Sequence, residues 1–353
     1  MVNLKSFYRN KKVVITGNTG FKGSWLSLIL YNLGAKVYGY SLKPQTNPSN
    51  FHLFNLSKIV KYMNGDVRNY KKFYKFLNNI KPDIIFHLAA QSLVKQSYLE
   101  PLKTFETNFN GTLNLIEISR KLNNLKSLVI ITSDKCYFND ERIKGYKEND
   151  RLGGIDPYSA SKASAENMFF SYSKSFFSNS KNIGIVSARA GNVIGGGDWS
   201  KDRIIPDFMK SLKNKKSFII RSPNSTRPWQ HVLDLSYGYL LLGMKCYGTN
   251  KFNGSWNFGP NKKNSISVIK IIKYLNSMFE NKKKILIKKE KLIKETKMLF
   301  LDSSKSKKLL NWIPKFSILS SLNNIIEWYN CYYFNKKNIK ILTNNQIKKY
   351  FQL

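Results

Sequence analysis

The fold is decided by the segment Val13-Val14-Ile15-Thr16-Gly17-Asn18-Thr19-Gly20-Phe21-Lys22-Gly23. Its apolar, β-branched start predicts a buried strand, and the glycine-rich residues after it predict a turn that opens a helix. Gly17 permits a tight turn, Gly20 lets the backbone approach a pyrophosphate, and Gly23 lets the helix lie close to the sheet. The helix N-terminus adds free N–H groups and a positive dipole end. We therefore predict a dinucleotide-binding turn with contacts from Gly17, Thr19, Gly20, Phe21, Lys22 and Gly23.

Working outward, short apolar strands alternate with longer helical stretches through the first half of the chain. The predicted buried strands are Lys12–Thr16, Lys36–Ser41, Asp83–Ala89, Ser127–Ser133 and Ile183–Arg189. The predicted helices between them are Gly23–Leu33, Tyr70–Asn78, Thr104–Leu122 and Tyr158–Phe177. This alternation predicts an α/β fold with a Rossmann-type, doubly wound parallel sheet.

After Arg189 the pattern breaks into loops that contain glycine and proline, and helical stretches resume at Leu235–Met244 and Ser267–Phe279. We expect residues 1–189 plus about 233–262 to form the cofactor-binding domain. Residues from about 190–232 plus 263–353 would form a smaller C-terminal lobe that binds the substrate. The tail from Asn335 is rich in lysine and asparagine, and we expect it to be at most partly ordered.

Composition narrows the class of protein. The 353 residues carry a formal net charge of +38, which is compatible with nucleic-acid binding. The lysines are scattered, however, and Lys, Asn, Ile, Phe and Tyr are over-used together, so a biased codon pool is the simpler interpretation. The apolar runs are strand-sized, the N-terminus has no secretory signal, and the three cysteines form no disulfide or metal pattern. We expect a cytoplasmic protein without a membrane or nucleic-acid partner.

The residues that would bind the adenosine are less clearly indicated by the sequence. Asp66, followed by Val67, is placed to accept from the adenine amino group, and the alternative for this carboxylate is a solvated turn. The second strand ends in Tyr40-Ser41, with no acidic residue to hold the ribose 2′-hydroxyl. Because no acid excludes a 2′-phosphate there, this strand does not distinguish NAD from NADP.

A tyrosine, a lysine and a serine form a candidate site for alcohol oxidation. Tyr158 and Lys162 are four residues apart, so a helix places them on one face. A phenol with an ordinary pKa of about 10 is a poor base, but a nearby ammonium and a positive nicotinamide ring favour its phenolate. Ser133 follows a predicted strand and would lie at the carboxyl edge of the sheet, where ligands bind.

The next two residues add a different chemistry. Asp134 and Lys135 follow the serine directly. Elimination of water needs one group to abstract a proton beside a ketone and another to protonate the departing hydroxyl. The two residues therefore predict a dehydration step, and the alternative is a charged pair at a strand end that faces solvent.

At these motifs the chain resembles the CDP-glucose 4,6-dehydratases, a family of extended short-chain dehydrogenases/reductases. The resemblance reaches about residue 330 and is carried by the segments Thr16–Leu26, His87–Gln91, Thr132–Tyr137, Asp156–Lys162, Ala188–Trp199, Thr226–Val232, Leu301–Lys305 and Leu309–Pro314. Related dTDP-glucose dehydratases carry Asp-Glu where this chain has Asp134-Lys135. The resemblance implies NAD as the cofactor, further cofactor contacts at Leu88, Ala89 and Ala90, and a homodimer built through two helices of each subunit.

The resemblance also implies a reaction cycle on CDP-glucose. Tyr158 would take the C4 hydroxyl proton while the C4 hydride passes to NAD, with Ser133 bonded to that oxygen and Lys162 holding the ribose. Lys135 is then placed to remove the C5 proton and Asp134 to protonate the leaving C6 hydroxyl, although their assignment as acid and base stays open. Return of the hydride to C6 gives CDP-4-keto-6-deoxyglucose.

Substrate contacts are expected from Gln91, Asn192, Arg203, Arg227 and His231. Arg227 is suited to a pyrophosphate because a guanidinium matches phosphate oxygens bidentately, whereas Arg203 and His231 have structural roles as alternatives. Trp199 and Trp229 are interpreted as packing residues. The alternatives to the whole assignment are a 4,6-dehydratase for GDP-mannose or dTDP-glucose and a non-catalytic NAD-binding or nucleic-acid-binding protein.

Overall fold

A parallel sheet organises the molecule. The computed structural model describes residues 3–179, 182–213, 217–260, 265–280, 282–288, 298–335 and 338–353. Seven strands hydrogen-bond in the order β11-β6-β5-β4-β1-β2-β3, and every neighbouring pair is parallel. The strands are β1 (Lys12–Thr16), β2 (Lys36–Ser41), β3 (Lys61–Asn64), β4 (Ile84–His87), β5 (Ser127–Ile131), β6 (Gly184–Ala190) and β11 (Gly254–Phe258). The predicted Rossmann-type sheet is confirmed, with β3 and β11 as additional strands.

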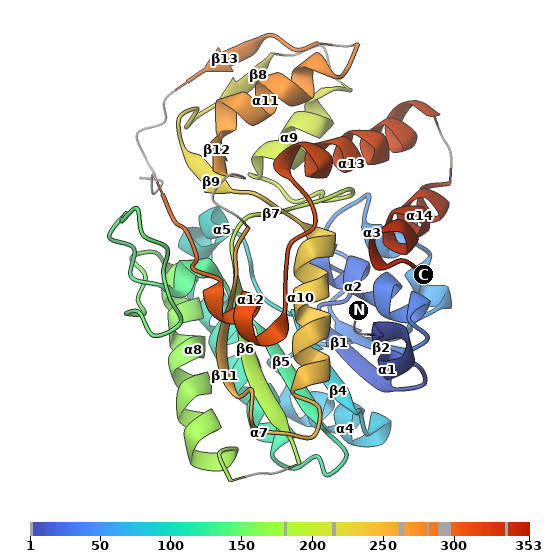
Figure 1. The fold of residues 1–353 in the computed structure, drawn as a ribbon, viewed down its shortest axis with the longest axis vertical. Coiled ribbons are helices and arrows are strands. Elements are labelled where there is room, and N and C mark those ends of the chain that lie inside the picture. Colours follow the sequence, from blue (N-terminus) through green and yellow to red (C-terminus); the bar gives the residue numbers. More distant parts are fainter. Residues whose placement is uncertain are drawn as a thin grey trace.

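Helices cover both faces of the sheet (Figure 1). One buried cluster joins alternate strand residues such as Val13 and Ile15 to α1 (Leu4–Tyr8), α2 (Phe21–Asn32) and α10 (Val232–Lys245). The other joins the intervening residues, such as Val14, to α4 (Tyr70–Ile80), α7 (Gly111–Ser119) and α8 (Pro157–Phe176). The single helix predicted for residues 104–122 is divided into α6 (Pro101–Phe105), a π-helical turn (Glu106–Asn110) and α7. Strand residues that are buried on both sides explain the continuous apolar runs.

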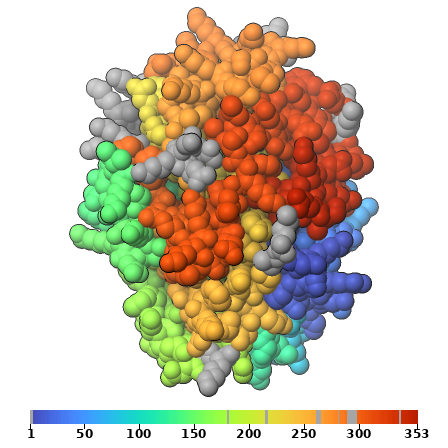
Figure 2. Space-filling view, in the orientation of Figure 1, coloured from blue at the N-terminus to red at the C-terminus, as the bar shows by residue number. Residues whose placement is uncertain are grey.

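Most elements after residue 190 gather beyond one end of the sheet, at the top of Figure 1. They include three two-stranded sheets, β7–β10, β8–β13 and β9–β12. Their strands are β7 (Val193–Ile194), β8 (Phe218–Ile220), β9 (Thr226–Pro228), β10 (Gln230–His231), β12 (Ser265–Ser267) and β13 (Ile285–Ile287). The helices of this half are α9 (Ile204–Ser211), α11 (Val268–Ser277), α12 (Ser304–Leu310) and α13 (Ile318–Asn330). In the space-filling view, residues of this half, yellow to red, cover the upper part and the centre of the face shown (Figure 2).

The C-terminal tail corrects one expectation. Instead of being at most partly ordered, residues Ile339–Phe351 form helix α14, which Asn338 caps through its side chain. Ile347 and Tyr350 are buried, and the Tyr350 hydroxyl donates to Asp234 Oδ1 at 2.6 Å. The buried positions of α14 recur every three or four residues, as in an amphipathic helix. The abundance of lysine and asparagine in this segment made that spacing hard to recognise in the sequence. Among the described helices, none has the length and apolar character needed to cross a membrane.

Candidate active site

Two glycines of the predicted cofactor turn are required by the fold itself. Gly17 has φ +71°, and a Cβ built on it would lie 2.8 Å from the Ala89 backbone nitrogen. A Cβ on Gly23 would lie 2.1 Å from the Gly17 carbonyl oxygen. Real Cβ atoms do not approach backbone this closely, so β1, the turn and α2 meet only because these residues lack side chains.

Gly20 is different, because the protein leaves space at this position. Its backbone has φ −77° and ψ 172°, which any residue adopts, and a Cβ there would meet only the Gly17 carbonyl oxygen at 3.4 Å. No side chain caps the start of α2, and its first turn has no acidic residue. Free N–H groups beside an open glycine fit a pyrophosphate, so the turn suits the predicted dinucleotide.

This contrast predicts opposite behaviour for two alanine variants. Gly20→Ala should change the free energy of unfolding by less than about 0.5 kcal/mol, because its backbone accepts alanine. The same methyl group would crowd the phosphates and weaken NAD binding about tenfold or more, which corresponds to about 1.4 kcal/mol. Gly23→Ala should lower the free energy of unfolding by about 1–3 kcal/mol through overpacking. Urea denaturation and calorimetric titration with NAD measure both effects, and equal loss of stability in the two variants would contradict this account.

The end of β2 presents neutral groups where many dinucleotide sites have an acid. Ser41 Oγ donates to Asn18 Oδ1 at 2.8 Å, and both residues are buried. Among the described residues, no partner satisfies Asn18 Nδ2. An amide and a hydroxyl at this position suit ribose oxygens, and they bring no negative charge that would repel a 2′-phosphate.

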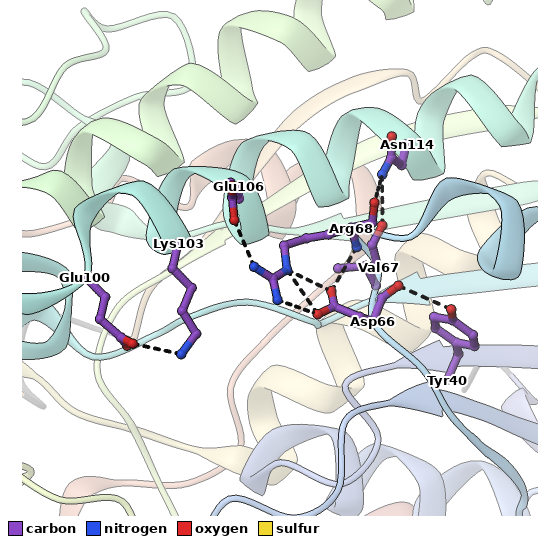
Figure 3. A network of polar contacts seen from close by, with 8 residues as sticks. All are labelled: Tyr40, Asp66, Val67, Arg68, Glu100, Lys103, Glu106 and Asn114. Carbon is purple, nitrogen blue, oxygen red and sulfur yellow. Dashed lines mark hydrogen bonds and ion pairs between the residues drawn. The ribbon is translucent and has the colours of Figure 1, made fainter.

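Asp66 is held in a polar network beside this strand (Figure 3). Arg68 pairs with its carboxylate at 2.7 Å and with Glu106 at 2.8 Å. Burial opposes ionisation, but the hydrogen bonds and charge of Arg68 prevail and lower the pKa of Asp66. Asn114 donates to the Val67 carbonyl at 3.0 Å and fixes the adjacent backbone. Asp66 is thus an oriented carboxylate rather than a freely solvated one, and its contact with adenine stays a prediction.

His87, a buried residue that was not predicted to have a role in the site, links the ends of β1 and β4 to α7 through hydrogen bonds. The Ala89 N–H donates to Thr16 Oγ1 at 3.1 Å, so the Thr16 hydroxyl is free to donate to His87 Nδ1 at 2.8 Å. His87 Nε2 then donates to Thr112 Oγ1 at 3.2 Å. Burial, with the charge of Lys162, lowers the pKa of His87 to about 3, which keeps the ring neutral. The chain of bonds fixes the Leu88–Ala90 backbone against the glycine turn.

The structure brings Ser133, Tyr158 and Lys162 together at the carboxyl edge of the sheet. Ser133 lies two residues after the end of β5, and Tyr158 and Lys162 occupy the first two turns of α8. Pro157 and the Asp156 cap, which accepts from the Ser159 N–H at 2.9 Å, begin this helix. All three side chains are buried, and Ser133 lies near enough to Tyr158 to act on the pKa of its phenol. The predicted oxidation constellation is therefore present as a geometric unit.

Burial sets the protonation of this unit. It raises the pKa of Tyr158 to about 12, and the Ser133 hydrogen bond opposes the shift. It lowers the pKa of Lys162 to about 8, with Glu166 acting in the opposite direction. Below about pH 8 Lys162 is an ammonium ion, and it lies one helical turn from Tyr158. Because burial raises the pKa of Tyr158 to about 12, proton removal by Tyr158 benefits from a further positive charge such as a nicotinamide ring.

A buried ion pair attaches α8, the helix that carries Tyr158 and Lys162, to the sheet. Glu166, four residues after Lys162, pairs with Arg189 at 2.7 Å and accepts from Thr132 Oγ1 at 2.5 Å and from Ser187 Oγ at 2.9 Å. These bonds attach α8 to β5 and β6 next to Ser133. The sequence analysis missed Glu166, although the regular spacing of Tyr158, Lys162 and Glu166 on one helix face was a signal for it.

The acid and base predicted for dehydration have different surroundings. Asp134 is buried, Ser133 Oγ donates to its Oδ1 at 3.0 Å, and a Cβ on Gly191 would lie 2.9 Å from its Oδ2. Burial raises the pKa of Asp134, and the charge of Lys135 opposes the shift. A buried carboxyl with a raised pKa is not part of a solvent-facing charged pair, and it is suited to donate a proton. This favours Asp134 as the acid.

Lys22, in the cofactor turn, is influenced by the charged groups around Asp134. Burial lowers the pKa of its ammonium group to about 7, and the charges of Lys162 and Arg203 lower it further. Asp134 and Asp198 act on it in the opposite direction. Lys22 is therefore within electrostatic range of Lys162 and Asp134 as well as part of the cofactor turn.

The predicted substrate residues divide into two groups. Arg203, paired with Asp198 at 3.0 Å, lies near Tyr158, and Arg227 lies near Asp134. Asn192 adjoins Gly191, beside Asp134. These three residues border the catalytic groups.

The other two predicted substrate residues are engaged within the protein. The Gln91 side chain bonds both backbone groups of Leu93 and the Thr104 hydroxyl. The His231 ring lies in the core, 6.3 Å from the Trp25 ring and 5.0 Å from the Phe316 ring. Burial lowers the pKa of His231 to about 3. This geometry favours the structural role that the sequence left open for His231.

Both tryptophans interpreted as packing residues are buried, Trp199 among aromatic rings that include Trp328 and Tyr329. The Trp229 indole donates to the Ile266 carbonyl at 3.0 Å. Their positions agree with packing rather than with base stacking.

Comparisons with known proteins identify a family and several similar proteins for this chain. The profile of the GDP-mannose 4,6 dehydratase family matches residues 14–325. A CDP-glucose 4,6-dehydratase of Salmonella typhimurium is 42% identical over 92% of both chains. Among solved structures, epimerase Mth375 of Methanothermobacter thermautotrophicus has a TM-score of 0.80, 22% identity and coverage of 96% of this chain and 97% of its own. A dTDP-glucose 4,6-dehydratase of Streptomyces venezuelae with NAD and TYD bound has a TM-score of 0.76, 20% identity and coverage of 92% and 100%. With a matching profile, a close relative and a shared fold, this chain belongs to the GDP-mannose 4,6 dehydratase family of extended short-chain dehydrogenases/reductases.

Proposed function

We propose that the chain is an NAD-dependent hydro-lyase that converts CDP-glucose to CDP-4-keto-6-deoxyglucose and water. One observation carries the proposal: an oxidation unit, Ser133, Tyr158 and Lys162, lies directly beside Asp134, a buried carboxyl with a raised pKa. A simple oxidoreductase needs the first set alone, whereas elimination of water also needs an acid and a base.

Each residue receives a role from its position. Tyr158 takes the proton of the sugar C4 hydroxyl, and Ser133 hydrogen-bonds the same oxygen. Lys162, one helical turn from Tyr158 on α8, favours the phenolate. The resulting ketone acidifies the C5 hydrogen, which Lys135 removes, and Asp134 donates a proton to the departing C6 hydroxyl. NAD bound at the glycine turn would accept a hydride at the start of the cycle and return it at the end.

The substrate choice rests on the Salmonella relative. The Salmonella typhimurium CDP-glucose 4,6-dehydratase is 42% identical to this chain, whereas the human dTDP-D-glucose 4,6-dehydratase is 26% identical. Lys135 in place of glutamate also separates the chain from the dTDP-linked enzymes it resembles. The alternatives are dehydration of dTDP-glucose or GDP-mannose.

The test is a panel of nucleotide sugars. Purified protein with NAD is incubated separately with CDP-glucose, dTDP-glucose, UDP-glucose and GDP-mannose, and loss of water is followed by mass spectrometry. We expect dehydration of CDP-glucose. Dehydration of another sugar instead would refute the substrate, and no reaction with any of them, despite bound NAD, would favour a non-catalytic role.

A nucleic-acid-binding function is the alternative that the charge of +38 suggests. The intact catalytic set speaks against it. Tight binding to generic DNA that weakens steeply with salt would support it instead.

We further propose the division expected from the sequence, with residues 1–189 plus about 233–262 holding NAD and the remaining lobe holding the nucleotide sugar. The buried catalytic groups at the carboxyl edge of the sheet support this division, because the two parts meet there. The buried residues Cys136, Cys246 and Cys331 form no disulfide in the described part of the chain, which supports a reducing cytoplasm as the location.

A homodimer is the proposed assembly. Three large apolar side chains are exposed near α6 and on α8: Leu99 at 76%, Leu102 at 72% and Phe170 at 62%. Helices α6 and α8 contact each other, and a second copy that packs on this pair of helices would cover exposed apolar side chains.

We expect Phe170→Glu to convert the dimer to a monomer at micromolar concentration, because a buried, unpaired carboxylate opposes association. Light scattering coupled to size-exclusion chromatography measures the mass. Glu substituted for Phe334, an exposed aromatic residue elsewhere on the chain, is the control. A wild-type monomer, or an unchanged dimer in Phe170→Glu, would contradict this interface.

A further inference from the structure

Gln230 has an unusual environment for a polar side chain. It is 2% exposed, and both polar atoms of its amide are fully buried. Among the described residues, neither Nε2 nor Oε1 has a hydrogen-bond partner. Buried amides are nearly always paired, so an amide with both ends unpaired indicates a group that the protein chain itself does not supply.

The backbone around Gln230 is well fixed. Strand β10 pairs with β7 in parallel, which places Gln230 level with Val193, and the Gln230 N–H donates to the Asn192 carbonyl at 3.1 Å. Its neighbour His231 turns into the core between Trp25 and Phe316. Side chains alternate along an extended chain, so Gln230 projects to the side opposite His231.

The segment that pairs with Gln230 shows which parts of the site lie near it. Val193, which is level with Gln230, is the middle residue of the short row Gly191–Gly195. At one end of this row, a Cβ on Gly191 would lie 2.9 Å from Asp134 Oδ2. At the other end, a Cβ on Gly195 would lie 3.1 Å from the Phe21 ring in the cofactor turn. Gln230 thus lies between the catalytic carboxyl and the first turn of α2.

The proposed cofactor must span the same interval. Its phosphates fit the turn that ends at Phe21, and its nicotinamide ring must reach Tyr158 and Ser133 beside Asp134. A nicotinamide carries a carboxamide, which offers one carbonyl acceptor and two N–H donors. A glutamine amide offers the complementary set, so the two groups can exchange a pair of hydrogen bonds.

We propose that Gln230 belongs to the nicotinamide pocket and that its side-chain amide pairs with the carboxamide of NAD. The proposal rests on the proposed function for the identity of the cofactor. It goes beyond that function by assigning a residue that recognises the nicotinamide end of the cofactor. A leucine at this position would have a similar size but could form no hydrogen bonds. The bonds would hold the ring in register with the sugar C4 atom.

The test compares two ligands on the protein without added substrate. NAD and ADP-ribose share the adenosine and both phosphates, but only NAD carries the carboxamide. Calorimetric titration should show that Gln230→Leu weakens NAD binding about tenfold, as expected for a loss of paired hydrogen bonds, and leaves ADP-ribose binding unchanged. The analogue whose carboxamide is replaced by an acetyl group should lose less affinity than NAD on the same substitution.

Other outcomes decide against the inference. Unchanged NAD binding in Gln230→Leu, with a raised KM for the sugar, would assign Gln230 to the substrate instead. Equal weakening of NAD and ADP-ribose would show a distorted turn, and Gln230→Glu, which keeps the shape and one acceptor, checks whether the fold tolerates substitution. Failure of the unaltered protein to bind NAD would contradict the proposed cofactor itself, which separates that failure from a failure of this inference.

Discussion

Tyr158→Phe is expected to lower kcat by about 10³-fold, within the range of about 10² to 10⁴ that general bases contribute. The substitution removes only the hydroxyl group that takes the C4 proton, and the buried ring keeps its packing. Substrate and NAD should bind with affinities close to those of the unaltered protein. Stopped-flow absorbance of the reduced cofactor and mass spectrometry of the products measure the loss.

Tyr172→Phe is the matched control, because Tyr172 lies late on the same helix and packs against the buried cluster that α8 shares with α4 and α7. We expect this variant to keep full activity. Turnover in Tyr158→Phe within a few-fold of the unaltered protein would remove Tyr158 from its role as base.

Lys135→Ala should separate oxidation from dehydration. Its ammonium side chain, once deprotonated, is the group placed to remove the C5 proton, whereas Ser133, Tyr158 and Lys162 remain for the first step. We expect the absorbance of reduced cofactor to rise with CDP-glucose while loss of water slows about 10³-fold, as for a missing general base.

Lys174→Ala, at an exposed position late in α8, controls for the loss of one positive charge. Normal dehydration by Lys135→Ala would refute the base assignment. Failure to accumulate reduced cofactor would instead place Lys135 in the oxidation step. Asp134→Asn should give the same separation, because an amide keeps the size of the side chain but cannot donate an acidic proton.

The sheet was largely predictable because its strands are buried on both faces. Strands β1 and β2 have the predicted bounds, whereas α2 begins at Phe21 rather than at the predicted Gly23. Strand β3 was missed because it is an edge strand, Lys61–Asn64, with mainly exposed and polar residues. Strand β11 was missed because Gly254 and Asn257 interrupt its apolar pattern.

The site was predictable where chemistry lies in contiguous motifs, as for Ser133-Asp134-Lys135 and Tyr158–Lys162. Residues that act through distant partners were not. His87 depends on Thr16 and Thr112, and Gln230 is recognised only by its burial without a partner. His231 illustrates the reverse, because its motif suggested a substrate contact while its ring is enclosed by Trp25 and Phe316. Sequence spacing reports local faces, but long-range neighbours determine which polar groups remain available.

The most direct test of the central claim uses CDP-glucose that carries deuterium at C4 of the sugar. If Tyr158 removes the C4 hydroxyl proton while NAD accepts the C4 hydride, and this hydride returns after Asp134 and Lys135 remove water, the product should carry that deuterium at C6. Nuclear magnetic resonance of the isolated CDP-4-keto-6-deoxyglucose would show it. Deuterium lost to solvent, or CDP-glucose recovered unchanged in the presence of NAD, would contradict the account.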